Sequence, residues 1–202
     1  EPYLGSMFNK VSYDQIYDEH IFMFSISSVK KIFDLYDFKI VQALPQFTHG
    51  GSMRYFIKRK KQGIVSKNLM TLLEKEKINK IDSIEKCVEF KKNCEISKKK
   101  IQKDLNKFKS NNFKICGYAA TSKSTTILNY CAINYEIIDY ICDTTPEKIG
   151  KFSPGTHIPI VDMSYFYENT PDVAYLFAWN HKDEIFKKEK NYKGKWFSHV
   201  EL

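Results

Sequence analysis

The chain has 202 residues, which is enough for one large or two small domains. Its hydrophobic fraction of 43% and aromatic fraction of 15% exclude a disordered protein, and its apolar runs are too short to span a bilayer. The net charge of +8, which comes almost entirely from lysine, fits either a basic surface for an anionic partner or a solvated lysine-rich helix.

Five cysteines occur in the chain, and they form neither a CxxC pair nor a cluster with histidine. Cys116 and Cys142 lie in apolar runs, where a free thiol behaves as a small hydrophobic side chain. We therefore expect a cytoplasmic protein with no disulfide and no metal site in this stretch. The start at Glu1 shows no signal-peptide pattern, and the missing initial Met suggests a piece excised from a longer protein.

The first region, residues 1–62, is predicted to contain a helix followed by two strands. A helical pattern of apolar residues opens at Ser27. Residues 38–44 then form a strand that Pro45 ends, and residues 52–58 form a second strand in which polar and apolar residues alternate. Because no helix separates the two strands, we expect an antiparallel sheet edge.

The second region, residues 63–110, is almost free of glycine and proline and is rich in lysine, glutamate and isoleucine. Apolar residues recur near helical spacing, which predicts two or three helices. The last of them, at about 85–110, should be long and amphipathic with its lysine side in water. Cys87 and Cys94, two turns apart, should share its buried face.

The third region, residues 111–202, alternates strands and helices. Such alternation implies right-handed crossovers and a parallel sheet. We therefore expect a small three-layer α/β unit. The predicted strands are 113–119, 136–143, 158–160, 173–179 and 195–200, and the predicted helices are 122–130 and 183–190.

The densest group of chemically active side chains lies at residues 13–20, which hold two tyrosines, three carboxylates and a histidine. His20 could accept a proton, Glu19 or Asp18 could orient it, and Tyr17 could donate from its phenol. The alternative is a polar loop that caps an edge of the core.

The turn at residues 48–52 pairs two glycines with His49 and Ser52. Glycine lets the backbone approach a ligand closely and permits positive φ. Exposed N–H groups with these two side chains could therefore hold an anion or hydroxyl groups. An ordinary tight turn is the alternative.

Two further segments have the layout of ligand sites in α/β sheets. Residues 117–125 combine a strand end, a turn of small residues and a helix start, with Lys123 and hydroxyl side chains as donors instead of the usual glycines. Thr156 and His157 follow a Pro-Gly turn, and Asn180 follows a buried strand. Their alternative roles are a simple turn and a helix cap at Asn180.

In order and spacing these segments resemble the sugar C-methyltransferase family, whose members use S-adenosyl-L-methionine to modify nucleotide-linked deoxy sugars. The resemblance covers nearly the whole chain and is weakest in the lysine-rich helices. The matching stretches are SYDQIYDEH, FSISSVKKIF, THGGSMRYFIKR, LNYC, PGTHIPI and AWNHKDEI.

The resemblance implies a protein of three parts: a zinc-binding N-terminal domain, a Rossmann-type methyltransferase domain and a Rossmann-like C-terminal domain. Residues 1–62 resemble the end of the class I methyltransferase domain, residues 63–110 a helical connector, and residues 111–202 the C-terminal domain with its parallel sheet. The donor-binding loop and the zinc-binding cysteines would lie outside the chain. The fragment is therefore expected to be inactive alone.

The resemblance also implies the reaction. A base removes a proton from the carbon beside a ketone of the sugar, and the enolate attacks the donor methyl group in line. His20 is the predicted base, with Tyr17 and Glu19 to position it or to stabilise the enolate oxygen. His49 and Ser52 are expected to line the sugar site. The other predicted substrate-binding residues, for the nucleotide side, are Lys123, Thr156, His157 and Asn180.

Three alternatives remain at this point. One is O- or N-methyl transfer to another activated substrate, and another is a non-catalytic module that binds a nucleotide-linked sugar. The third, nucleic-acid binding through the lysine-rich helix, ranks last because that helix lacks interleaved aromatic residues. We expect neither nucleic acid nor membrane as a partner, and the sequence does not predict the oligomeric state.

Overall fold

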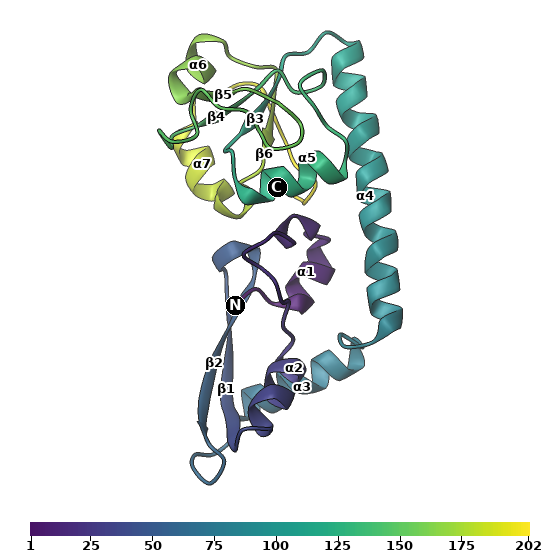
Figure 1. The fold of residues 1–202 in the computed structure, drawn as a ribbon, viewed down its shortest axis with the longest axis vertical. Helices are drawn as coiled ribbons and strands as arrows, with labels where there is room; N and C mark the ends of the chain where they lie inside the picture. Colours follow the sequence, from purple (N-terminus) through teal and green to yellow (C-terminus); the bar gives the residue numbers. More distant parts are fainter. The chain divides into compact units, whose positions relative to one another are not determined.

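The structure, a computed structural model, describes all 202 residues and divides them into two compact units. The first unit comprises Glu1–Ser12 and Asp18–Asn93, and the second comprises Tyr13–Tyr17 and Cys94–Leu202 (Figure 1). A five-residue segment therefore leaves the first unit, packs in the second, and returns. No helix combines the length and apolar character needed to cross a bilayer.

The first unit is built on an antiparallel pair of strands, as expected. Pro45 does not end the first strand, because it pairs opposite Met53 and the strand continues to Gln46; a two-stranded sheet has open edges, where proline is tolerated. The elements of this unit are helices α1 (Leu4–Lys10), α2 (Ile26–Asp34) and α3 (Lys67–Ile78), strands β1 (Phe38–Gln46) and β2 (Ser52–Arg59), and the 3-10 turn η2 (Thr48–Gly50).

A buried carboxylate joins α3 to the start of α2. Glu76 is 3% exposed, and its two oxygens accept hydrogen bonds from the backbone N–H groups of Ile26, at 2.7 Å, and Ser27, at 2.9 Å. A negative charge at a helix N-terminus is favourable because it meets unpaired N–H groups and the positive end of the helix dipole. Ser25 caps the same helix, two residues before the predicted start at Ser27.

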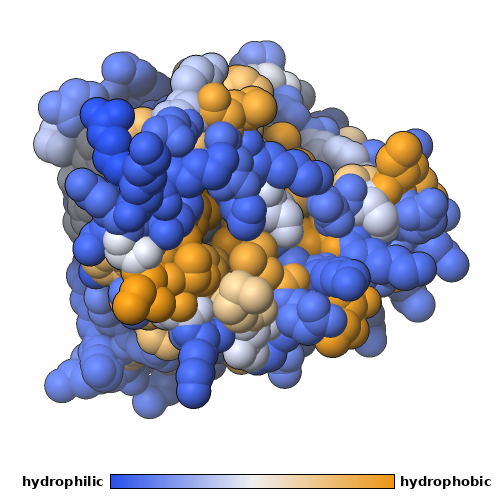
Figure 2. Space-filling view, turned by 90° about the horizontal axis from the view of Figure 1, so that it is seen from below, coloured by the Kyte–Doolittle hydropathy of each residue, from blue (hydrophilic) through white to orange (hydrophobic).

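The first unit also leaves large apolar side chains in contact with solvent, and Figure 2 shows such hydrophobic areas between hydrophilic residues. A two-stranded sheet is marginally stable alone, and large exposed apolar patches are typical of interaction surfaces. The most exposed of these side chains include Ile21, Phe22, Leu35, Tyr36, Phe47 and Ile64.

One long helix, α4 (Ile84–Ser110), follows α3, so the second region forms two helices. Its lysines are mostly exposed, and its buried residues are Cys94, Ile101 and Leu105. The expectation that Cys87 shares this buried face is wrong, because Cys87 is exposed. A helix face is buried only where a neighbouring element packs against it, and the sequence spacing alone does not show where that happens.

The second unit contains a five-stranded, fully parallel sheet with the strand order β5-β4-β3-β6-β7. This confirms the predicted parallel α/β arrangement. The order runs outward from β3 to β5 on one side and then reverses, because β6 pairs on the other side of β3. The elements are β3 (Ile115–Tyr118), α5 (Ser122–Tyr130), β4 (Tyr140–Asp143), β5 (Ile160–Asp162), α6 (Met163–Glu168), β6 (Val173–Leu176), α7 (Lys182–Lys188) and β7 (Lys195–Phe197).

Several strands are shorter than the apolar runs that predicted them. The run at 136–143 contributes only Tyr140–Asp143 to the sheet, because Asn134 Oδ1 accepts a hydrogen bond from the N–H of Glu136 and holds a turn before it. The run at 173–179 ends as a strand at Leu176, and the 3-10 turn η3 (Trp179–His181) follows. Asn180 lies inside η3 and is not the cap of α7, which begins after His181. The expected domain boundaries at 62/63 and 110/111 stay predictions.

We expect Gly155→Ala to lower the free energy of unfolding more than Gly150→Ala, which is the matched control. Both glycines have positive φ, of 76° and 80° respectively, so either alanine costs about 1 kcal/mol in backbone strain. A Cβ at position 155 would lie 2.2 Å from Asn129 Oδ1, whereas position 150 has no atom within 4 Å. Asn129 donates to the carbonyls of Thr125 and Pro154, and losing these bonds adds about 1–2 kcal/mol. Urea denaturation followed by tryptophan fluorescence measures the difference; equal losses would contradict it.

Candidate active site

His20, the predicted base, and His49, predicted to line the sugar site, lie together in the first unit. Their ring centroids are 6.0 Å apart, with an edge-on interplanar angle of 87°. His20 follows the turn at residues 18 and 19 and is half-buried, whereas His49 is exposed on η2. Imidazole can accept or donate a proton near neutral pH. This pair therefore offers proton-transfer chemistry at the surface of the first unit.

The turn that presents His49 is held by its neighbours. His49 itself has a positive φ of 55°. Ser52 is 6% exposed, and its hydroxyl donates to the carbonyl of Thr48 at 3.0 Å. Lys10 Nζ donates to the carbonyl of Gly50 at 2.5 Å. Ser52, which was predicted to line the sugar site, therefore helps to hold the turn that carries His49.

The other two predicted catalytic residues, Tyr17 and Glu19, belong to different units. Tyr17 is half-buried and is the last residue of the segment that packs in the second unit, whereas Glu19 is exposed in the first. Their convergence with His20 on one substrate stays a prediction.

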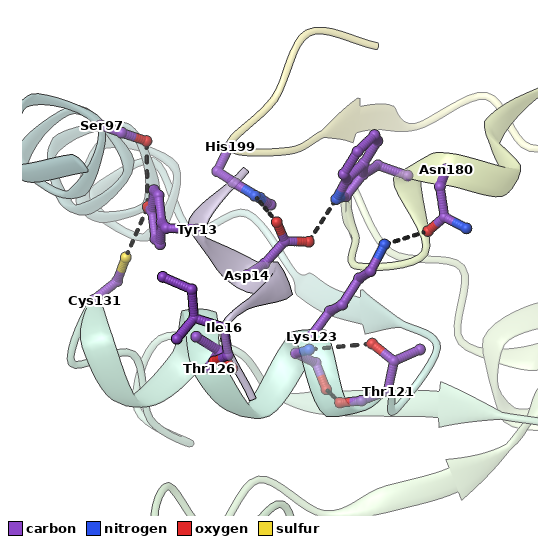
Figure 3. A network of polar contacts seen from close by, with 12 residues as sticks. Tyr13, Asp14, Ile16, Ser97, Thr121, Lys123, Thr126, Cys131, Asn180 and His199 are labelled. Carbon is purple, nitrogen blue, oxygen red and sulfur yellow. Dashed lines mark hydrogen bonds and ion pairs between the residues drawn. The ribbon is translucent and has the colours of Figure 1, made fainter. Parts of the chain in front are cut away.

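A second polar group, which we call the Asp14 cluster, comprises Asp14, Lys123, Trp179, Asn180 and His199 (Figure 3). Asp14 is fully buried. One carboxylate oxygen accepts a hydrogen bond from Trp179 Nε1 at 2.6 Å, and His199 Nε2 lies 3.1 Å from the other oxygen. Lys123 Nζ donates to Asn180 Oδ1 at 2.9 Å and lies 4.7 Å from the centre of the Trp179 ring, a cation–π distance.

Opposing effects act on the charge of Asp14. Burial disfavours the carboxylate and by itself raises the pKa of Asp14, but the nearby His199 and Lys123 and the hydrogen bond from Trp179 outweigh it, so that the pKa lies below the usual value of 3.8. Asp14 is therefore an ionised carboxylate at neutral pH. Its negative charge sits among two potential cations and an indole N–H, which satisfies the requirement that a buried charge be paired.

The Asp14 cluster lies at the carboxyl edge of the parallel sheet. Lys123 is in the first turn of α5, which follows β3, whereas Trp179 and Asn180 follow β6 and His199 follows β7. The strand order reverses between β3 and β6, and open α/β sheets bind ligands at such a reversal. Lys123 and Asn180, predicted separately from the sequence, thus meet at this reversal; their contact with a nucleotide stays a prediction.

Thr156 and His157 lie elsewhere. Their loop packs on the last turn of α5, where Asn129 Nδ2 donates to the carbonyl of Pro154 at 3.0 Å, whereas Lys123 is on the first turn. Thr156 is buried and its hydroxyl is 2.6 Å from that of Ser153, while His157 is exposed. The structure therefore does not bring this pair to Lys123 and Asn180.

Three members of the cluster were not among the predicted site residues: Asp14, Trp179 and His199. Asp14 lies in the segment that the sequence singled out, and Trp179 is next to Asn180. A buried tryptophan needs an acceptor for its N–H, which is the one hint that the sequence contains. Gly117, the glycine retained in the strand–turn–helix segment, serves packing, because a Cβ there would lie 2.6 Å from the ring of Phe177.

No three His, Cys, Asp or Glu side chains come together in a way that could hold a metal ion. The expected zinc belongs to a domain outside these residues, so that expectation stays untested.

Comparison with known proteins finds a matching family and a relative. A family model described as C-methyltransferase C-terminal domain matches residues 47–200. C-methyltransferase NovU of Streptomyces niveus is 28% identical over 192 residues, which are 95% of this chain and 46% of NovU. The chain thus spans less than half the length of this relative.

We expect acid to destabilise the second unit through Asp14. Because the pKa of Asp14 is below 3.8 in the folded protein, the unfolded chain takes up a proton first as the pH falls. The stabilisation is therefore complete above that value and is lost below it. Both tryptophans, Trp179 and Trp196, lie in this unit, so their fluorescence in urea titrations at pH 2.5–7 reports on it. In Asp14→Asn the free energy of unfolding should fall less at acid pH than it does in the unmodified protein. Parallel plots of unfolding free energy against pH for the two proteins would contradict the expectation.

Proposed function

This chain belongs to the C-methyltransferase C-terminal domain family, and we propose that it carries the acceptor-side residues of an enzyme that methylates a carbon atom of a nucleotide-linked keto sugar. The observation that carries the proposal is the pairing of His20 with His49, whose ring centroids are 6.0 Å apart. Two segments that resemble sugar C-methyltransferases at separate places in the sequence thus contribute to one surface of the first unit.

The chemistry requires a base. Hydrogen on a carbon beside a ketone is acidic because the resulting negative charge is delocalised onto the ketone oxygen. In the proposed reaction His20 takes this proton, and Tyr17 and Glu19 position the imidazole or stabilise the enolate oxygen. A well-placed base contributes on the order of 10²–10⁴-fold to the rate. His49 would contact the sugar beside the reacting carbon.

The family implies S-adenosyl-L-methionine as the methyl donor, but the residues present do not fit a donor site. Such a site needs a glycine-rich loop after one parallel strand and an acidic side chain after the next. After β3 the chain reads Ala119–Thr121 without glycine. After β4, Asp143 already accepts from the N–H groups of Ala120, at 2.6 Å, and Thr145, at 2.8 Å. The first unit has only an antiparallel pair of strands.

We therefore propose that the donor site lies in a part of the protein outside these 202 residues. These residues alone would not catalyse methyl transfer. Two features support this. The chain spans 46% of the length of NovU. In addition, the first unit has a two-stranded sheet and exposed apolar side chains such as Phe47, which is 99% exposed, as the end of a larger domain would leave uncovered.

The carboxyl edge of the parallel sheet is the proposed nucleotide side. Lys123 supplies a positive charge beside Asn180 at the reversal of strand order, and an ammonium group attracts phosphate. Thr156 and His157 stay predicted contacts that this geometry does not support.

In the complete enzyme, we expect His20→Gln to lower kcat by about 10²-fold or more while the affinity for the nucleotide-linked sugar changes little, because the substitution removes the base. Stopped assays of methylated product give kcat, and isothermal titration calorimetry gives the affinity. His181→Gln is the matched control, since His181 has a 58% exposed side chain near Glu184. Turnover by His20→Gln close to that of the control would remove His20 as the base.

The site of methylation separates C-methyl transfer from O- or N-methyl transfer. With a keto sugar nucleotide in D₂O, we expect the new methyl group on the carbon beside the ketone and deuterium exchange at that carbon, both read by mass spectrometry and NMR. The exchange should disappear in His20→Gln. Methylation of oxygen or nitrogen would favour the other transferase reaction, and binding without any methylation would favour a non-catalytic module.

A further inference from the structure

The 3-10 turn η1 (Tyr13–Gln15) and the residue after it are held at several points in the second unit (Figure 3). The hydroxyl of Tyr13 lies 3.2 Å from Ser97 Oγ and 3.5 Å from Cys131 Sγ. On the other side of Asp14, the carbonyl of Ile16 accepts a hydrogen bond from Thr126 Oγ1 at 3.0 Å. Tyr17 comes directly after Ile16, so the backbone that carries Tyr17 is fixed at the preceding residue.

Asp14 lies at the centre of this segment, and stability alone does not explain a charge at that position. A fully buried charge must be desolvated, and well-packed apolar residues in place of a buried ion pair are often neutral or stabilising. The best-supported role of such pairs is to select one arrangement among several. Asp14 meets Trp179 and His199, which come from two different strand ends. It therefore fixes where η1 lies relative to the carboxyl edge of the sheet.

We infer that Asp14 is a positioning residue: with Trp179 and His199 it holds the segment that carries Tyr17, one of the proposed catalytic residues. The inference rests on the proposed function. Asp14 itself touches no substrate and transfers no proton. Catalytic groups displaced by about 1 Å can cost about 10²-fold in rate, so a loosened segment should slow the chemical step more than it weakens binding.

Three substitutions in the complete enzyme test this. Asp14→Ala removes both contacts and should lower kcat about 10–100-fold, with the KM for the nucleotide-linked sugar and the affinity for S-adenosyl-L-methionine nearly unchanged. Asp14→Asn keeps an amide oxygen for Trp179 and should recover most of the rate. Trp179→Phe keeps an aromatic ring but removes the N–H donor, so we expect a smaller loss of kcat than in Asp14→Ala. This variant tests the inference if Asp14→Ala does not fold.

Asp139→Ala is the matched control for lost stability. Asp139 accepts from the N–H of Ile115 at 3.0 Å and pairs with Lys109 at 2.6 Å. It precedes β4 and so lies at the amino edge of the sheet, opposite the Asp14 cluster. This variant should unfold more easily and yet keep its kcat when assayed well below its unfolding temperature. The rate of deuterium exchange into the sugar, measured without the methyl donor, should fall in Asp14→Ala and not in Asp139→Ala.

Equal losses of kcat in Asp14→Ala and Asp139→Ala, or a normal kcat in folded Asp14→Ala, would overturn the positioning role. If His20 is still required in that case, the proposed function stands and only this inference fails. If the unmodified enzyme does not methylate the carbon of a keto sugar, the proposed function and the positioning role fail together.

Discussion

The second unit is organised around one electrostatic requirement, the pairing of a carboxylate that has no access to water. Asp14 comes from near the start of the chain, whereas its partners Trp179 and His199 come from near the end. Each partner follows a different strand of the parallel sheet. Leaving any one of these groups unpaired in the interior is costly, so the early segment and the carboxyl edge of the sheet keep a common arrangement. The lysine that the sequence predicted for the nucleotide side, Lys123, also lies over the ring of Trp179 and donates to Asn180.

Under the proposed function the two units divide the work. The first unit presents imidazole groups at His20 and His49, which suit removal of a proton from carbon. The second provides the reversal of strand order, where Lys123 adds positive charge. Tyr17 belongs to the second unit although it lies close in sequence to His20. If Tyr17 acts in catalysis as proposed, the fixed position of η1 within the second unit bears on the reaction.

Local patterns in the sequence predicted much of the fold, because the corresponding structure depends on neighbouring residues. Helix α5 has the predicted bounds, Ser122–Tyr130, and α4 begins one residue before its predicted start. The parallel sheet followed from alternating strands and helices. The predicted burial of Cys87 was wrong, and the strand predicted at 136–143 was longer than the observed one. Burial and strand length depend on which distant element packs against a segment. Local patterns also could not predict the strand order or the partners of Asp14. The Asp14–Trp179 contact, for example, joins residues 165 positions apart. His20 and His49 were selected from their local residue patterns, and the resemblance to a family supplied their proposed roles; the structure places their rings edge-on with centroids 6.0 Å apart.

The path of the chain between the units has a practical consequence. The backbone passes from one unit to the other three times: after Ser12, after Tyr17 and after Asn93. Cleavage by a protease after Ser12 or after Tyr17 would therefore leave the units covalently joined, whereas cleavage after Asn93 would leave residues 94–202 attached only through the non-covalent packing of residues 13–17. Expression of residues 94–202 alone would yield a sheet whose Trp179 and His199 lack their carboxylate. To produce the second unit by itself with all its residues, the segment Tyr13–Tyr17 would have to be added as a separate peptide or fused to residues 94–202.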